Sequence, residues 1–398
     1  MKKIYLNLAH LGGEEINYVQ KAFDEDWVAP LGPNVNGFEE DLKQYLGGGK
    51  EVLALSSGTA AVHLGMVGCG VTKGDEVIVQ SFTFCASANP ALYLGAKPVF
   101  VDSERETWNI DPELLEEAIE DRMAKTGRKP KAIVPVSLYG MPFQADRIME
   151  IADRYGIPVL EDSAEGLGST YHGRQLCTFG KFGVLSFNGN KIITTSAGGA
   201  LICPDRETKE RMLYFSTQAR EPYPFYQHDE LGYNYHMSNV CAGIGRGQMA
   251  VLQDHLDRHR HIERMYEELL GAIPGISVHS APSPEMQSNY WLSTLTLDPD
   301  LQVKGQEKCS VFAEEGIVAP NRNVLAVKAL LEKEGIESRP LWKPLHLQPL
   351  YDGAPYYGHH ESLCEDLFRK GLCLPGGPRV SDSDIRFICH CINEAIVH

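Results

Sequence analysis

Short apolar segments alternate with helical segments along the first two-thirds of the chain. The apolar segments are residues 51–55, 76–79, 98–101, 132–136 and 157–160, and helical patterns lie among them at residues 60–67, from 110 onward and at 146–155. The apolar segments show no alternation with polar residues, which is typical of strands buried on both faces. This order predicts an α/β fold with a mostly parallel sheet between helices.

The pattern changes after about residue 245. Residues 249–270 form a long, charged, amphipathic pattern that predicts a bridging helix. Residues 290–297 then predict a strand, and residues 324–333 and 381–397 predict helices of a smaller α+β unit. We therefore expect a large domain of residues 1–248 and a C-terminal domain of residues 249–398 that includes the bridging helix. The first eleven or so residues are expected to pack on the smaller domain.

Two helix starts carry clear capping signals. Asp111 is expected as the N-cap of one helix, with Pro112 at its first position, and Ser381 as the N-cap of the last helix. Three histidines of the bridging helix invite a metal interpretation, but arginines lie between them, so we expect a solvated helix face and no metal site. These residues are His255, His259 and His261, with Arg258, Arg260 and Arg264.

Charge and composition exclude several classes of partner. A formal net charge of −16 argues against nucleic acid or an anionic membrane surface, because each needs a basic surface. No apolar segment approaches the length of a membrane span, and the first eight residues are too short and polar for a signal peptide. Ten cysteines without a CxxC pair predict buried thiols in a cytoplasmic protein.

Lys191 is the single cation in a segment of small and polar residues, 186–201. A lysine in such a segment, rather than on a solvated helix face, is typical of a lysine that uses its amine as nucleophile and base. Ser186 lies five residues earlier and offers a hydroxyl that could bind an anion such as a phosphate. The segment therefore predicts a chemical role for Lys191.

Three other places follow predicted strands and offer complementary groups. Ser57, Gly58 and Thr59 lie between a strand and a helix, where hydroxyls and free amide groups bind anions. Asp162 lies at the carboxyl end of a predicted strand, the edge at which open α/β sheets bind ligands. Phe84 offers a flat face after another strand. Taken singly, each of them is better explained by helix capping or core packing.

Taken together, these groups suit pyridoxal 5′-phosphate. A lysine amine can bond its aldehyde, an aspartate can hold its ring nitrogen protonated, and an aromatic side chain can stack on its ring. The joint occurrence is far more specific than any single member. A nicotinamide dinucleotide is disfavoured because no GxGxxG motif follows the first strand.

Four segments resemble the DegT/DnrJ/StrS-type sugar aminotransferases, which are pyridoxal phosphate enzymes of fold type I. They are residues 56–64 (SSGTAAVHL), 161–165 (EDSAE), 186–192 (SFNGNKI) and 232–239 (GYNYHMSN). The resemblance covers nearly the whole chain, residues 10–377. It implies a large domain with a mostly parallel seven-stranded sheet between helices, and a smaller C-terminal α+β domain.

Carried over residue by residue, the resemblance implies a role for each group. Lys191 would form the Schiff base, and Asp162 would pair with the pyridine nitrogen. Glu165 would approach the ring 3-oxygen, where its negative charge is expected to favour a protonated group. Phe84 would stack on the ring. The phosphate would be bound by Ser57, Gly58, Thr59 and Ser186. Asn234 would reach the phosphate of the neighbouring subunit, in a homodimer with shared sites.

A finer resemblance points to the sugar. Residues 218–222, 226–228 and 337–351 are similar to members that act on UDP-linked 2-acetamido-4-keto-6-deoxy sugars. Arg220, Arg339 and Lys343 are candidates to meet a diphosphate, Trp342 to flank the base or sugar, and His346 to contact substrate. A surface ion pair or a core aromatic explains each of them equally well.

The resemblance implies transfer of an amino group from L-glutamate to C4 of such a UDP-keto sugar, in the biosynthesis of a bacterial surface polysaccharide or glycan. Members that dehydrate sugars carry histidine at the position of Lys191, so the lysine favours transamination. His236 and Ala197 depart from the family pattern, which usually has arginine and glutamate or glycine there. An inactive pyridoxal phosphate-binding regulator, a dTDP-keto sugar and amination at C3 therefore stay open.

Overall fold

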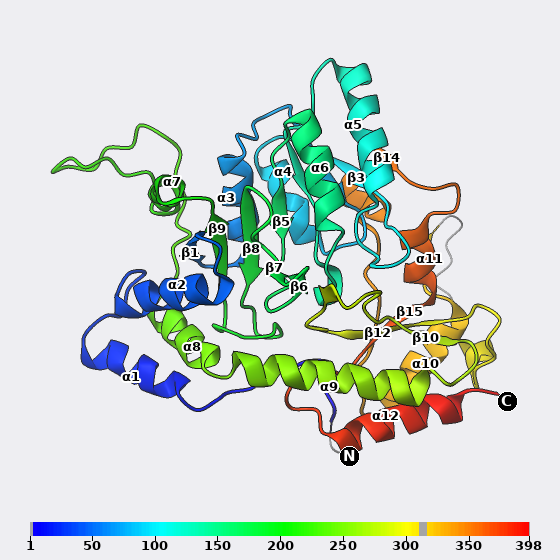
Figure 1. The fold of residues 1–398 in the computed structure, drawn as a ribbon. Helices are drawn as coiled ribbons and strands as arrows, with labels where there is room; N and C mark the ends of the chain where they lie inside the picture. Colours follow the sequence, from blue (N-terminus) through cyan, green and yellow to red (C-terminus); the bar gives the residue numbers. More distant parts are fainter. Residues whose placement is uncertain (1–2, 310–316, 398) are drawn as a thin grey trace.

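The structure is a computed structural model that describes residues 3–309 and 317–397 (Figure 1). Within these residues, two groups of hydrogen-bonded strands join into one central sheet. They are joined by two parallel bridges, one between Ile133 and Val159 and one between Val136 and Asp162. All neighbouring strands are parallel except β9, which is antiparallel to both its neighbours. The strand order is β1 (Glu51–Leu55), β9 (Gly199–Cys203), β8 (Phe182–Ser186), β5 (Leu160–Asp162), β4 (Ala132–Val134), β2 (Glu76–Gln80), β3 (Lys97–Val101), β14 (Tyr356–Tyr357). The short edge strand β14 comes from the C-terminal part of the chain and adds an eighth strand to the seven that the family resemblance implies.

Alternate residues of these strands enter two different cores, which explains why the strands are apolar throughout. In β1, Leu53 and Leu55 face one core and Val52 and Ala54 face the other. Helices cover both faces, as the sequence predicts. On one face lie α3 (Gly58–Gly68), α4 (Asn89–Tyr93) and α7 (Arg206–Ser216), and on the other α2 (Pro33–Leu46), α5 (Pro112–Thr126), α6 (Ala145–Tyr155) and α8 (Asn239–Met249).

The predicted helix starts are confirmed. The carboxylate of Asp111 accepts hydrogen bonds from the amides of Glu113 and Leu114, and Pro112 is the first residue of α5. Ser381 and Asp384 form a reciprocal capping box at the start of α12 (Asp382–Ala395). No helix in the described parts of the chain is both long and apolar enough to cross a membrane.

The C-terminal part builds a second sheet with its own core. The bridging helix is α9 (Leu252–Leu270). Two residues separate it from the end of α8, and it runs below the central sheet to the second one (Figure 1). At the N-terminus, Ile4 pairs with Ile336 and Leu6 accepts a bond from the amide of Gly376. The second sheet has the order β10 (Ile276–Val278), β12 (Ser293–Leu297), β15 (Gly371–Leu374), β13 (Arg339–Pro340), with α10 (Arg322–Lys333) and α12 packed on it.

The expectation of a solvated histidine face on the bridging helix is wrong for two of its three histidines. His255 donates to the carbonyl of Ile192 at 2.9 Å and His259 to that of Tyr290 at 3.0 Å, and both are buried. Only His261 stays near the surface. The helix lies between both parts of the molecule, so it has a second buried face. Burial lowers the pKa of His255, and that of His259 to about 4. No cluster of three possible ligands that could hold a metal ion exists among the described residues.

Candidate active site

One cavity of about 400 Å³ gathers most of the residues that the sequence singles out. It lies at the carboxyl ends of β1, β5 and β8, which are mutually parallel and therefore end at one edge of the sheet. The C-terminal part completes the wall with Trp291, Arg339 and Trp342. The sequence-predicted residues that line it are Ser57, Gly58, Thr59, Phe84, Asp162, Glu165, Ser186 and Lys191.

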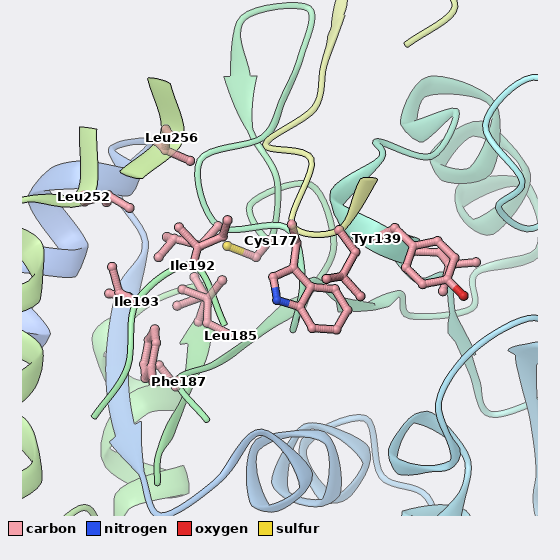
Figure 2. Close-up of a cluster of buried hydrophobic side chains, with 14 of the residues drawn as sticks. Tyr139, Cys177, Leu185, Phe187, Ile192, Ile193, Leu252 and Leu256 are labelled. Carbon is pink, nitrogen blue, oxygen red and sulfur yellow. The ribbon is translucent and has the colours of Figure 1, made fainter. Parts of the chain in front are cut away.

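The amine of Lys191 is enclosed at this cavity. Its Nζ lies 3.3 Å from Oε1 of Glu165 and 4.0 Å from the centroid of the Trp291 ring, and the side chain is 14% exposed. The next two residues, Ile192 and Ile193, point into the apolar core beside Leu252 of α9 (Figure 2). The packing of these two side chains therefore holds the backbone next to Lys191 in place, while the amine of Lys191 faces the cavity.

Glu165 is fixed as the ionic partner of that amine. Its Oε2 accepts a hydrogen bond from the amide of Tyr139 at 2.7 Å, which leaves Oε1 to Lys191. Burial raises the pKa of Glu165, while the charge of Lys191 and the Tyr139 bond act in the opposite direction. Tyr139 has φ of 55°, a left-handed conformation that turns its amide toward the carboxylate.

Asp162 is the second buried carboxylate at the cavity. Ser87 Oγ donates to its Oδ2 at 2.6 Å, and the amide of Ala164 donates to Oδ1 at 3.2 Å. Burial raises the pKa of Asp162, and these two bonds together with the charge of Lys191 lower it. A cationic group facing this carboxylate would relieve the cost of its burial.

The turn from β1 into α3 forms a small-residue cradle. Ser57 caps α3 through a bond from the amide of Ala60 at 3.0 Å, so the capping explanation also holds. A Cβ on Gly58 would lie 2.9 Å from Cβ of Ser186, and one on Gly199 would lie 2.4 Å from the amide nitrogen of Gly58. Glycine is therefore needed for the helix start to lie against Ser186. Amides in the first turn of a helix have no acceptor within their own helix, so the start of α3 is suited to bind an anion.

Phe84 and Trp342 form an aromatic pair at the cavity. Phe84 is half exposed, and its ring centroid lies 5.3 Å from that of Trp342. Trp342 is stacked nearly parallel to Tyr139, and its amide donates to the Tyr139 hydroxyl oxygen at 2.9 Å. The anion seat, buried carboxylate, exposed ring and enclosed amine are the groups that pyridoxal 5′-phosphate requires, so the residues present fit this cofactor.

Sequence reasoning missed Trp291, Tyr139 and Asn190. Trp291 stands in a segment with the pattern of a strand, and nothing in that pattern distinguishes it from a core residue. In the structure its Nε1 donates to the carbonyl of Asn190, the residue before the lysine, at 2.5 Å. The polar run around Lys191 was the only available signal for Asn190, which lines the cavity.

Of the five substrate candidates, the cavity brings in Trp342 and Arg339, and Arg339 also pairs with Glu337 at 3.0 Å. Arg220 is exposed over the ring of Tyr226. Lys343 lies outside the cavity lining. His346 is stacked on a tyrosine ring, and its two nitrogens contact Ser81 and Glu365.

The remaining predicted residues lie at different distances from this cavity. Asn234 is exposed and outside the cavity lining, bridged to Thr217. His236 donates from Nδ1 to the carbonyl of Pro30 at 2.5 Å, which is a structural contact. Ala197 lines the cavity beside Ser196, whose φ is 70°. The two departures from the family pattern thus affect different places, one a loop contact and one the cavity wall.

Comparison with known proteins finds one matching family and related aminotransferase sequences. The model of the DegT/DnrJ/EryC1/StrS aminotransferase family matches residues 9–393. EpsN of Bacillus subtilis (strain 168), a candidate pyridoxal phosphate-dependent aminotransferase by name, is 45% identical over 385 residues, 96% of this chain and 93% of that protein. A GDP-perosamine synthase of Escherichia coli O157:H7 is 34% identical over 394 residues, 99% of both chains.

Solved structures show the same fold. A DegT DnrJ EryC1 StrS aminotransferase from Brucella abortus has a TM-score of 0.85 at 28% identity, covering 96% of this chain and 95% of that one. The pyridoxal phosphate form of Spr1654 from Streptococcus pneumoniae, a candidate sugar aminotransferase, has a TM-score of 0.86 at 24% identity, covering 99% and 98%. The agreement extends over both parts of the chain.

Proposed function

This chain belongs to the DegT/DnrJ/EryC1/StrS aminotransferase family, and on that premise we propose that it transfers an amino group from L-glutamate to C4 of a UDP-linked 2-acetamido-4-keto-6-deoxy sugar. It is a pyridoxal phosphate-dependent sugar aminotransferase. One observation supports the proposed site above all others. The enclosed amine of Lys191, the buried carboxylate of Asp162 and the helix start at Gly58 face one cavity.

Each part of this cavity has a place in holding the cofactor. Gly58, Thr59 and Ser186 would bind the phosphate, with Ser57 capping the helix behind them. Asp162 would keep the ring nitrogen protonated and Phe84 would cover the ring, while Lys191 would bond the aldehyde carbon. When bound, pyridoxal phosphate supplies a ring that accepts the electrons left on a carbon that loses its proton.

Lys191 then serves as acid and base. Its Nζ would take the proton from the α-carbon of L-glutamate and later deliver one to the carbon that receives the amine. Glu165, 3.3 Å away, stabilises Nζ while it holds the proton. Trp291 covers the amine on a face away from bulk water. These three residues together form the proton-handling group of the site.

The nucleotide part of the substrate would extend from the cavity past Arg339. A diphosphate there would compete with Glu337 for the guanidinium. Arg220 lies on the connection between α7 and α8, which extends away from the body of the molecule and carries the exposed rings of Phe225 and Tyr226 (Figure 1). In a homodimer with shared sites, this connection would bring Arg220 and Asn234 to the neighbouring cavity.

The sugar and its nucleotide are tested with a panel of substrates. UDP-, dTDP- and GDP-linked keto sugars are incubated with the enzyme and L-glutamate, and products are identified by mass spectrometry and NMR. The GDP arm is included because one relative is named GDP-perosamine synthase. Amination at C4 of the UDP substrate is expected. Amination in the GDP or dTDP series only, or at C3, would replace the UDP-C4 assignment.

The chemistry itself is tested at Lys191. Wild type should release 2-oxoglutarate from L-glutamate in the absence of sugar, and Lys191→Ala should abolish this release. Lys191→Arg is the matched control, because it keeps the positive charge beside Glu165 but offers no nucleophilic amine. Release by Lys191→Ala at a wild-type rate would remove the proposed role. No release by the wild type with any amino donor would favour a pyridoxal phosphate-binding regulator instead.

A further inference from the structure

We infer that Trp291 is a positioning residue that holds the amine and the backbone of Lys191 at once. The inference rests on the proposed role of Lys191 as the reactive amine, and it concerns the lysine while its amine is not bonded to the cofactor. It depends on two separate contacts, one to the side chain of Lys191 and one to the residue before it.

The first contact is between the amine and the indole face. Nζ of Lys191 lies 4.0 Å from the centroid of the Trp291 ring. The negative face of an aromatic ring attracts a cation, and tryptophan attracts it more strongly than tyrosine or phenylalanine. Glu165 lies 3.3 Å from the same nitrogen, so an aromatic face and a carboxylate both contact the amine.

The second contact is to the backbone. Nε1 of Trp291 donates to the carbonyl of Asn190 at 2.5 Å, and the same oxygen accepts a bond from Nδ2 of Asn7 at 2.9 Å. The peptide unit immediately before Lys191 is therefore held by two donors. One comes from the N-terminal segment and the other from the segment after the bridging helix. Rotation of this peptide would move the amine, and the two bonds oppose that rotation.

The indole is itself rigidly placed. Trp291 is 2% exposed, and its amide donates to Oδ1 of Asn289 at 2.8 Å. Nδ2 of the same asparagine donates to the carbonyl of Glu165 at 2.8 Å. The indole face and the carboxylate that meet the amine are thus joined through one side chain. The Trp291 indole and the Glu165 carboxylate are therefore held at a fixed separation, which defines one position for the amine between them.

Trp291 therefore gives the detached amine one defined resting position that is shielded from water. A site without the indole face would lose one cation–π contact and leave the four-carbon side chain free to adopt other rotamers. The amine would then react more readily with any added electrophile, while it would reach its proper target less often. Faster reaction with an added electrophile, together with less frequent reaction at the proper target, distinguishes loss of positioning from a general loss of structure.

The test measures the reactivity of the amine in the full-length protein after hydroxylamine has removed the cofactor. Limited acetic anhydride is added at pH 8, and acetylation of Lys191 is followed by peptide mass spectrometry. We expect Trp291→Leu to be acetylated about two- to thirtyfold faster than wild type, the range that one cation–π contact provides. Trp291→Phe, which keeps an aromatic face, should stay close to wild type.

Two controls separate this result from loosening of the fold. Lys209, which pairs with Glu39 at 2.7 Å elsewhere in the large domain, reports general exposure in the same samples. Trp342→Leu removes the other indole of the cavity, which makes no cation–π contact with Lys191 among the described residues, and should leave Lys191 acetylation unchanged. Unchanged Lys191 reactivity in Trp291→Leu, equal acceleration in Trp291→Phe, or a parallel rise at Lys209 would overturn the inference.

Failure here would differ from failure of the proposed function. The acetylation experiment contains neither cofactor nor substrate, so its outcome says nothing about whether amino transfer occurs. Conversely, full turnover by Lys191→Ala would remove the proposed chemistry whatever the acetylation rates are.

Discussion

Nδ2 of Asn289 donates a hydrogen bond to the backbone carbonyl of Glu165 at 2.8 Å. The same nitrogen donates to the carbonyl of Leu167 at 2.9 Å, and Oδ1 accepts from the amide of Trp291. Asn289 is fully buried. One amide side chain therefore fastens the C-terminal part of the chain to the loop that carries the partner of Lys191. The cavity depends on this junction as much as on the strand ends.

Replacing Asn289 by alanine should destabilise the protein by about 2–4 kcal/mol, because two buried carbonyls would lose their donor. Urea unfolding monitored by fluorescence measures this change. Asn17→Ala is the matched control, since its amide bonds Glu14 at the surface, and a change below about 0.5 kcal/mol is expected there. Equal losses of unfolding free energy in Asn289→Ala and Asn17→Ala would mean that the buried junction stabilises the protein no more than a surface hydrogen bond.

Asp162→Asn should lower the rate of 2-oxoglutarate release at least about 100-fold while the fold persists, because asparagine keeps the shape but cannot supply the charge that holds a ring nitrogen protonated. The ligand-free protein should lose little stability, since burial already raises the pKa of Asp162 and its charge is costly. Initial rates and thermal unfolding check the two expectations. Asp111→Asn, at a helix start outside the cavity, is the control for rate. A normal rate in Asp162→Asn would exclude the proposed role.

Glu165→Gln should lower the pH midpoint at which the visible absorption of the bound cofactor changes. The carboxylate is expected near the ring oxygen, where its negative charge stabilises a bound proton, and glutamine removes that charge without changing the size. A spectral titration from pH 5 to 10 measures the midpoint. Glu161→Gln is the comparison, because Glu161 accepts bonds from the amides of Cys177 and Gly180 and does not line the cavity. An unmoved midpoint in Glu165→Gln would dismiss the effect.

The local motifs made part of this site predictable from the sequence. The apolar strands and their order predict the sheet, and the parallel direction of β1, β5 and β8 brings their carboxyl ends together. Gly58, Asp162 and Lys191 each lie within a few residues of such an end. Their meeting therefore follows from the topology once the strands are correctly assigned.

Other parts of the site depend on contacts between distant segments, which local patterns do not encode. Trp291 meets Lys191 across 100 positions, and its segment has the composition of an ordinary strand. His255 and His259 were expected in solvent because arginines surround them, yet Arg260 extends along the helix surface to the carbonyls of Ser288 and Gly168. A long arginine side chain can thus border a buried face, which charge patterning alone does not reveal.

Glu263 on the bridging helix should make stability depend on pH. It is 2% exposed, and burial raises its pKa to about 8, although the hydroxyl of Ser293 acts in the opposite direction. Between its ordinary pKa of 4.5 and about 8, the folded state holds a proton that the unfolded state has lost. The contribution of this group to stability is therefore full below pH 4.5 and decreases as the pH rises through that window.

Glu263→Gln removes this dependence because glutamine resembles the protonated acid. We expect little difference from wild type in urea unfolding at pH 5, and a variant that is more stable than wild type at pH 8.5, by up to about 4 kcal/mol. Glu267→Gln, one helical turn further and exposed, should follow the wild-type profile at both pH values. Parallel profiles for Glu263→Gln and wild type would mean that Glu263 is already ionised in the folded protein, and the expected gain would then be absent.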